Sequence, residues 1–133
     1  IRTQEAGLAA STISRYRPVR EWLVARQRQI ARTQSMVLDG RDIGTVVLPD
    51  AKVKVYLTAT PEERARRRHQ ELLEAGQEAV YQDVLEQLKT RDLQDQTRAV
   101  DPLRPARGAV MLDTTHLSFE QTVQTILDLV ALA

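Results

Sequence analysis

Three short apolar segments, separated by longer amphipathic segments, most limit what this chain can fold into. They cover 36–39, 53–58 and 110–112, and each is too short to be a buried helix of ordinary length. Parallel strands need long crossover connections, and helices usually supply these connections. The sequence therefore predicts an α/β fold in which a parallel sheet is flanked by helices.

Five longer segments have helical spacing of apolar residues or residues typical of helix ends. Thr60 followed by Pro61 is typical of a helix start, and Gly76 is typical of a helix end. Ser118, followed three positions later by Gln121, is a capping-box pattern. The sequence therefore predicts helices over 3–15, from Pro18 to about Ala31, from Pro61 to about Ala75, from about Tyr81 to Arg98 and from Phe119 onward.

Charged residues follow the first apolar segment directly, in the stretch MVLDGRDIGTVVLPD at 36–50. Asp39, Arg41 and Asp42 stand at the predicted end of a strand, and two glycines allow the backbone to turn tightly there. Ligands of parallel sheets bind outside the carboxyl ends of the strands. We therefore expect these side chains to lie beside a ligand.

Two further clusters contain several arginines. Arg91, Asp95 and Arg98 are spaced i, i+4, i+7, and Arg64 and Arg68 are one turn apart in the helix after the second strand. Each cluster alone is also typical of a solvated helix surface with ion pairs. Together, arginines from three segments near one sheet edge favour a phosphorylated small ligand and phosphoryl-transfer chemistry.

Composition narrows the functional classes. The chain has 133 residues, enough for one small domain, and a net charge of +1, which argues against general polyanion binding. Its 16 arginines outnumber its 3 lysines, and arginine binds phosphate in bidentate fashion, although a compositional bias explains this excess equally well.

The chain has no cysteine and two histidines, so we expect no disulfide and no metal site built from these residues. No apolar run has the length of a membrane span, and no signal peptide is expected before the first helix.

Several segments, in this order, resemble bacterial cytidylate kinase, the CMP/dCMP kinase. They are GRDIGTVV with PDA, TATPEERARRR, RDLQDQTRAVDPL, and LDTT with SFEQ, and the opening IRTQEAGLAASTISRYRPVREWLVARQRQIA is also similar. The resemblance covers essentially the whole chain. It implies a P-loop-type nucleoside monophosphate kinase fold and transfer of the ATP γ-phosphoryl group to CMP or dCMP with Mg²⁺.

The resemblance also implies roles on the acceptor side of the site. Ser11, Arg20 and Asp42 would contact the cytosine and help to reject other bases. Arg41 would contact the nucleotide or orient its neighbours. Asp95 would bind the ribose or restrain the arginines.

On the phosphoryl side, the resemblance implies four catalytic arginines. Arg98, with Arg91, would hold the CMP phosphate and the charge of the transferring group. Arg64 and Arg68 would begin a mobile lid over ATP at about 68–80, and its closure would exclude water.

The sequence departs from the family pattern at one important point. The family begins with a strand and a Gly-rich phosphate loop, and none of the five glycines here is followed by lysine. Residues 1–133 therefore resemble the C-terminal part of a single kinase core.

In the family, the phosphate-loop strand lies between the strands matched by 36–39 and 53–58. We therefore expect these two segments not to pair with each other, and we expect the chain alone to be inactive. ATP and Mg²⁺ would be bound mainly through the absent segment and the phosphates.

Two other interpretations remain open. The absent phosphate loop favours a non-catalytic remnant that binds nucleotides or a partner, whereas the acid–arginine clusters favour a kinase. A nucleic-acid binder using the Arg-rich helix is disfavoured by the low net charge and the few aromatic residues. The kinase interpretation implies a cytoplasmic, monomeric enzyme of pyrimidine nucleotide metabolism, without nucleic-acid or membrane partners.

Overall fold

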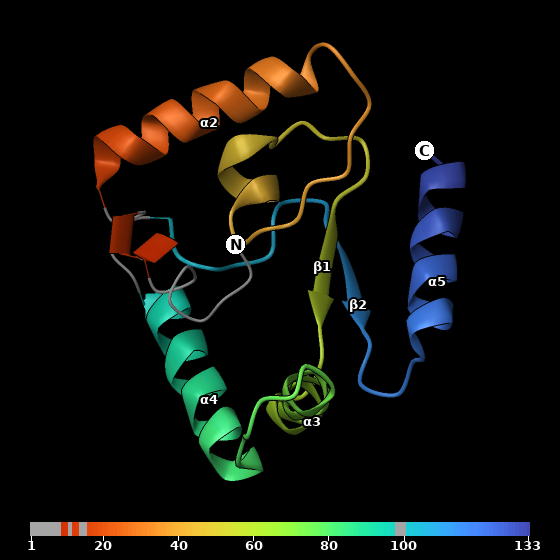
Figure 1. Cartoon of the computed structure of the whole chain (residues 1–133). Helices are drawn as coiled ribbons and strands as arrows, with labels where there is room; N and C mark the ends of the chain where they lie inside the picture. Colours follow the sequence, from red (N-terminus) through yellow and green to blue (C-terminus); the bar gives the residue numbers. More distant parts are fainter. Residues whose placement is uncertain (1–8, 11, 14–15, 98–100) are drawn as a thin grey trace.

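The computed structural model describes residues 9–10, 12–13, 16–97 and 101–133. The elements, in chain order, are α2 (Arg17–Ala31), the π-helix η1 (Ile43–Val47), β1 (Val55–Thr58), α3 (Pro61–Glu74), α4 (Tyr81–Thr97), β2 (Val110–Asp113) and α5 (Phe119–Ala131) (Figure 1). Residues 9–10 and 12–13 are helical, and the rest of the predicted helix over 3–15 lies outside the described residues. No helix in the described part of the chain is long and apolar enough to span a membrane.

A parallel sheet flanked by helices is present, so the predicted fold class is confirmed. β1 pairs with β2 in a register that runs from Val55 opposite Val110 to Thr58 opposite Asp113. The crossover between the two strands contains α3 and α4, as a parallel pair requires (Figure 1). Both strands point toward the start of α3, where sequence reasoning places the ligand edge.

The prediction of a third strand at 36–39 is wrong. These residues have no regular secondary structure, and the side chain of Val37 is 97% exposed. The described sheet contains only β1 and β2, so the backbone of 36–39 has no neighbouring strand with which to form a ladder. A short apolar segment becomes a strand only when a partner satisfies its backbone groups. The expectation that 36–39 and 53–58 do not pair with each other is therefore confirmed.

The turn predicted after Asp42 is a single turn of π-helix instead. In η1 the amide of Val47 donates to Asp42 O at 3.2 Å, and the amide of Leu48 donates to Ile43 O at 2.7 Å. Arg28 on α2 closes the end of η1, because its Nε donates to Val47 O at 2.9 Å and its Nη2 to Val46 O at 2.6 Å. Helix ends leave such carbonyls without partners, so α2 holds η1 in place.

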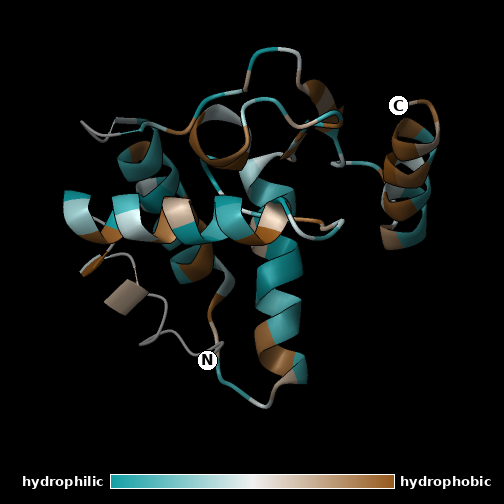
Figure 2. Ribbon diagram, turned by 90° about the horizontal axis from the view of Figure 1, so that it is seen from above, coloured by the Kyte–Doolittle hydropathy of each residue, from teal (hydrophilic) through white to brown (hydrophobic). Residues whose placement is uncertain are grey.

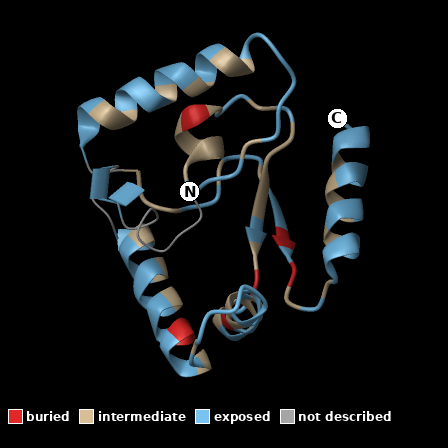
Figure 3. Ribbon diagram, in the orientation of Figure 1, coloured by how far each residue is buried: buried red, intermediate tan, exposed pale blue. Residues whose placement is uncertain are grey.

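The buried core lies between α3 and α4. Ala65 of α3 is fully buried, and Val84 and Leu85 of α4 are each 7% exposed (Figure 3). By contrast, α5 is the most apolar helix of Figure 2, yet Phe119 remains 79% exposed and Leu127 54% exposed. The packing therefore fixes α3 against α4 more firmly than it fixes α5.

The start of α3 follows the predicted capping pattern. Thr60 Oγ1 accepts from the amide of Glu63 at 3.3 Å, and Pro61 occupies the first helical position. Replacing Thr60 by alanine is expected to lower the free energy of unfolding by about 1 kcal/mol, measured by urea denaturation. Thr97 is exposed at the other end of a helix, where its hydroxyl donates to Leu93 O at 2.7 Å and accepts from no helix-start amide, so T97A is the control for loss of a threonine hydroxyl. Equal losses in the two variants would contradict a capping role for Thr60.

Candidate functional site

Carboxylate–guanidinium contacts join α2, the loop before η1, α3 and α4. Three sets of such contacts connect segments that are far apart in the sequence. They are Arg20 with Asp42 and Asp101, Asp95 with Arg41 and Arg91, and Arg64 with Asp92. Every set includes at least one residue that sequence reasoning assigned to the site.

Arg20 is held by two carboxylates from separate segments. It extends from α2, its Nη2 contacts Asp42 Oδ2, and the same nitrogen lies 2.8 Å from Asp101 Oδ2. The three side chains are only 14%, 16% and 32% exposed, respectively, so solvent screens these charges incompletely. Asp42 precedes η1 directly, so the π-helix fixes its position relative to α2.

Sequence reasoning missed Asp101. This residue has a positive φ of 49°, a conformation that non-glycine residues seldom adopt and that asparagine and aspartate tolerate best. It directly precedes Pro102, and the Asp-Pro pair marks a turn without indicating where the carboxylate points. Its contact with Arg20 spans 81 positions, which no local pattern encodes.

Asp95 lies between two arginines, as the helical spacing predicts for one of them. Arg91 Nε is 4.0 Å from Asp95 Oδ2 along the face of α4, and Arg41 Nε contacts the same oxygen from the loop before η1. The backbone carbonyl of Asp95 also accepts from the amide of Leu103 at 2.8 Å. The segment that contains Asp101 is thereby tied to the end of α4.

Arg64 forms a bidentate pair with an acid that sequence reasoning did not select. Its Nη1 and Nη2 donate to Asp92 Oδ1 and Oδ2 at 2.9 and 2.6 Å, and its Nε donates to Ala59 O at 3.0 Å. The hydrogen bonds to Asp92 raise the pKa of Arg64, so this group stays cationic. Arg64 is thus fixed between the end of β1 and α4.

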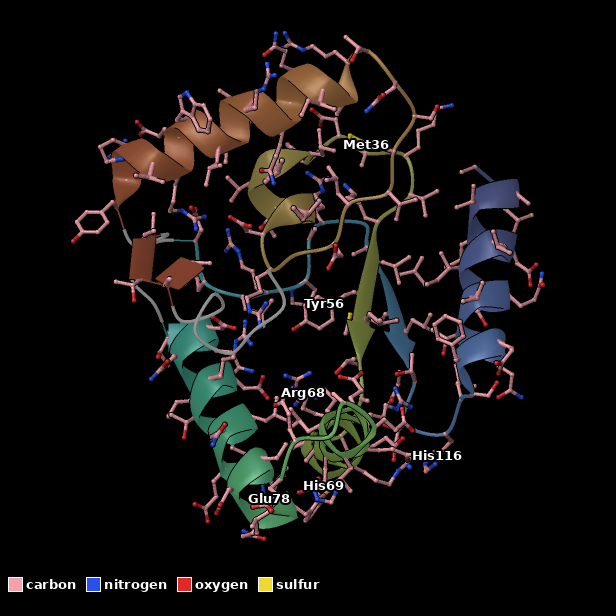
Figure 4. All side chains as sticks on the ribbon, viewed as in Figure 1. Met36, Tyr56, Arg68, His69, Glu78 and His116 are labelled. Carbon is pink, nitrogen blue, oxygen red and sulfur yellow. The ribbon has the colours of Figure 1, made fainter. Side chains whose placement is uncertain are left out.

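The other predicted residues are not all brought to this region. Arg68 pairs with exposed Glu71 on its own helix at 3.0 Å, apart from the Asp92 contact of Arg64. Ser11 and Arg98 lie outside the described residues. Figure 4 shows Tyr56 extending from β1 on the side where α4 lies.

Arg67, which sequence reasoning did not assign to the site, ties α3 to the end of β2. Its Nη1 donates to Thr114 Oγ1 at 3.0 Å, and its Nη2 donates to Thr114 O at 2.5 Å. Thr114 is 3% exposed and also donates from Oγ1 to Thr58 O at 3.0 Å. This network fixes the first turns of α3, and therefore Arg64, relative to the carboxyl ends of both strands.

Glu63 belongs to the same network and predicts a dependence of stability on acid pH. Hydrogen bonds from Arg66, and then from Arg67, lower its pKa from 4.5 to about 2. A carboxyl whose pKa is lower in the folded state stabilises the fold above its unfolded pKa, and this stabilisation is lost as the pH falls. We therefore expect the free energy of unfolding to fall as the pH is lowered from about 4.5 to 2.

Urea denaturation at several pH values measures this effect. E63Q is expected to weaken the dependence on pH in this range, because the glutamine does not titrate. E86Q removes an exposed carboxylate from α4 and is the matched control. An unchanged pH dependence in E63Q would exclude Glu63 as its source.

An open cavity of about 440 Å³ lies beside the Arg20 contacts. Arg20, Arg28, Val46 and Asp101 contribute to its lining, so α2 and η1 form two of its walls. Guanidiniums that are restrained by carboxylates keep further N–H groups for a ligand oxyanion. Within the described ranges, no group of three His, Asp or Glu side chains is placed to hold a metal ion. The arrangement therefore suits binding and charge stabilisation of a phosphorylated ligand.

Comparison with known proteins identifies the family. A family model described as cytidylate kinase matches residues 1–132. The cytidylate kinase of Thermosipho melanesiensis is 50% identical over 130 residues, which are 98% of this chain and 60% of that protein. Those of Shouchella clausii and Haemophilus ducreyi are 49% and 48% identical, over 98% and 96% of this chain and 58% and 57% of their own lengths.

The match covers nearly all of this chain but only part of each relative. The chain spans about 60% of the length of the curated relatives that it matches, and it corresponds to their C-terminal portion. Both the family match and the level of identity agree with the resemblance in the sequence motifs. The chain belongs to the cytidylate kinase family.

Proposed function

We propose that this chain is the acceptor-binding part of a nucleoside monophosphate kinase that transfers the γ-phosphoryl group of ATP to CMP or dCMP. Family membership supports the reaction class. The observation that carries the assignment to this part of the protein is the convergence of Arg20 with Asp42 and of Arg41 with Asp95, across 22 and 54 positions. Folding alone does not require these four residues to converge from three segments.

The acceptor base would lie beside Arg20 and Asp42, with Ser11 as a further contact. Arg20 contacts Oδ2 of Asp42, and no described residue donates a hydrogen bond to Oδ1. A carboxylate oxygen accepts from an amino group, which cytosine has at its 4-position and uracil lacks. Asp95, together with Arg41, would then bind the ribose or restrain the arginines around the phosphate.

The phosphoryl group would be surrounded by arginines from α3 and α4. Arg91 and Arg98 would hold the CMP phosphate and the charge of the transferring group, while Arg64 and Arg68 would begin a lid over about 68–80. Phosphoryl transfer depends mostly on positioning and charge stabilisation, which guanidiniums supply. Mg²⁺ would neutralise charge on the ATP phosphates, and residues outside this chain would contribute most of its binding. With this function, we expect the protein to be cytoplasmic and monomeric.

A chimera tests the proposed reaction. The N-terminal residues of the Thermosipho melanesiensis relative that have no counterpart here are joined to this chain, and CDP formation from CMP and ATP with Mg²⁺ is measured. We expect turnover by the chimera and none by the 133-residue chain alone. A folded chimera that phosphorylates AMP or UMP with the same kcat/KM as CMP would contradict the proposal. A chimera that binds CMP without turnover would favour a non-catalytic remnant.

The role of Asp42 in base selection can be tested separately. Asp42→Asn in the chimera is expected to lower kcat/KM for CMP about tenfold more than for UMP, because an amide is a weaker acceptor for the cytosine amino group. Steady-state kinetics with both nucleotides measures the ratio. Asp128→Asn, the same change at an exposed carboxylate on α5, is the matched control. An equal loss for both nucleotides would exclude Asp42 from base reading.

A further inference from the structure

A second open cavity, also of about 440 Å³, lies between η1 and the loop before β2. Its lining includes Gly44 and Thr45 of η1, together with Lys54, Arg104 and Arg107. Lys54 directly precedes β1, and Arg107 lies three positions before β2. The cavity therefore lies near the amino ends of the strands, whereas Arg64 and Thr114 lie near their carboxyl ends.

The charge of this cavity is unusual within the chain. Lys54, Arg104 and Arg107 contribute three cations, and no acidic residue lines it. In the described ranges, neither Arg104 nor Arg107 forms an ion pair or hydrogen bond, and Lys54 Nζ donates to Pro49 O at 2.6 Å. Most other described arginines are neutralised by carboxylates: Arg17, Arg20, Arg41, Arg64, Arg66, Arg67, Arg68 and Arg91.

We propose that this cavity is a second anion site, which binds a phosphorylated small molecule through its phosphate group. Guanidinium groups bind phosphate oxygens in bidentate fashion, and an ammonium group adds a further positive charge. The two walls already touch at the base of the cavity, because a Cβ on Gly44 would lie 3.0 Å from the Cβ of Ala106. A bound anion would therefore bridge η1 and the loop that contains Arg104 and Arg107.

Both walls of this second site are close in sequence to the residues that hold Arg20. On one wall, Gly44 and Thr45 lie two and three positions after Asp42; on the other, Arg104 lies three positions after Asp101. Asp42 and Asp101 are the carboxylates that contact Arg20. An anion that changes the spacing of the walls thus acts on the contacts of Arg20, which gives the second site a regulatory connection to the first.

Titration of the isotopically labelled 133-residue chain with inorganic pyrophosphate at constant ionic strength tests this inference. Two-dimensional NMR follows the backbone amides and the arginine side chains. We expect saturable shifts of Gly44, Thr45, Lys54 and Ala106, accompanied by a shift of the Arg20 side-chain resonance. Pyrophosphate that shifts only resonances around Arg64 and Arg91 would overturn the second site.

A matched pair of charge variants separates a built site from general attraction. R104Q/R107Q removes two exposed cations without hydrogen-bonding partners in the described part of the chain, and R26Q/R32Q removes two exposed cations from α2 and its C-cap position, away from the cavity. We expect at least a tenfold weaker affinity at the second site in R104Q/R107Q and unchanged affinity in R26Q/R32Q. Equal weakening in both variants would show that the affinity for pyrophosphate depends only on net charge, and it would overturn the proposal. The single variants R104Q and R107Q give the same comparison if the double variant does not fold.

Discussion

Replacing Arg20 by methionine is expected to lower the free energy of unfolding by about 2 kcal/mol. The methionine keeps much of the length of the side chain but removes the cation that Asp42 and Asp101 share. Two carboxylates that are 16% and 32% exposed then face each other without the guanidinium between them. Loss of one partner from a buried pair costs 3–5 kcal/mol, and the partial exposure here reduces that figure to about 2 kcal/mol. Urea denaturation measures the loss.

Two comparisons distinguish this effect from a general loss of charge on α2. R26M removes an exposed arginine of the same helix and is expected to change the free energy of unfolding by less than about 0.5 kcal/mol. Adding Asp42→Asn to R20M is expected to recover part of the loss, because one of the repelling charges is removed. A double variant that is less stable by the full sum of the two single losses would contradict the coupling.

Replacing Arg64 by lysine is expected to have the second largest effect. Lysine keeps the positive charge but cannot reproduce the two parallel hydrogen bonds to Asp92 and the third to Ala59 O. We expect a loss of about 2 kcal/mol in the free energy of unfolding, because α3 is released from α4 and from the end of β1. In the chimera, we expect kcat to fall about a hundredfold, because the role proposed for Arg64 at the transferring phosphoryl group requires its charge to be positioned accurately.

The neighbouring helix position provides the control for this prediction. Arg66 is on the same helix, is 60% exposed and pairs only with Glu63. R66K is therefore expected to alter both stability and turnover much less than R64K. Similar losses of stability and kcat in R64K and R66K would show that the bidentate contact of Arg64 with Asp92 has no special role.

The starts of α3 and α5 were predictable from the sequence because their signals are local. The cap at Thr60 and the capping box at Ser118 lie within three or four positions of the groups that they satisfy. The parallel direction of the strands followed from the long helical crossovers between them. The spacing of Arg91 and Asp95 likewise placed both on one face of α4.

What the sequence did not predict depends on partners that are distant in the chain. Residues 36–39 have the composition of a strand but lack a strand beside them, and η1 is closed by Arg28 across 18 and 19 positions. Asp92 and Asp101 reach their arginines across 28 and 81 positions. The arginines, Asp42 and Asp95 could be proposed from the sequence, but Asp92 and Asp101 required the three-dimensional structure.

The central claim is that these 133 residues contain the acceptor half of a cytidylate kinase site. Calorimetric titration of the chain with CMP, using UMP and AMP as controls, tests it most directly. We expect saturable binding of CMP, weaker binding of UMP, no binding of AMP, and a loss of the preference for CMP in Asp42→Asn. Equal binding of all three nucleotides, or binding of none, would contradict the claim that Arg20, Asp42, Arg41 and Asp95 form an acceptor pocket within this chain.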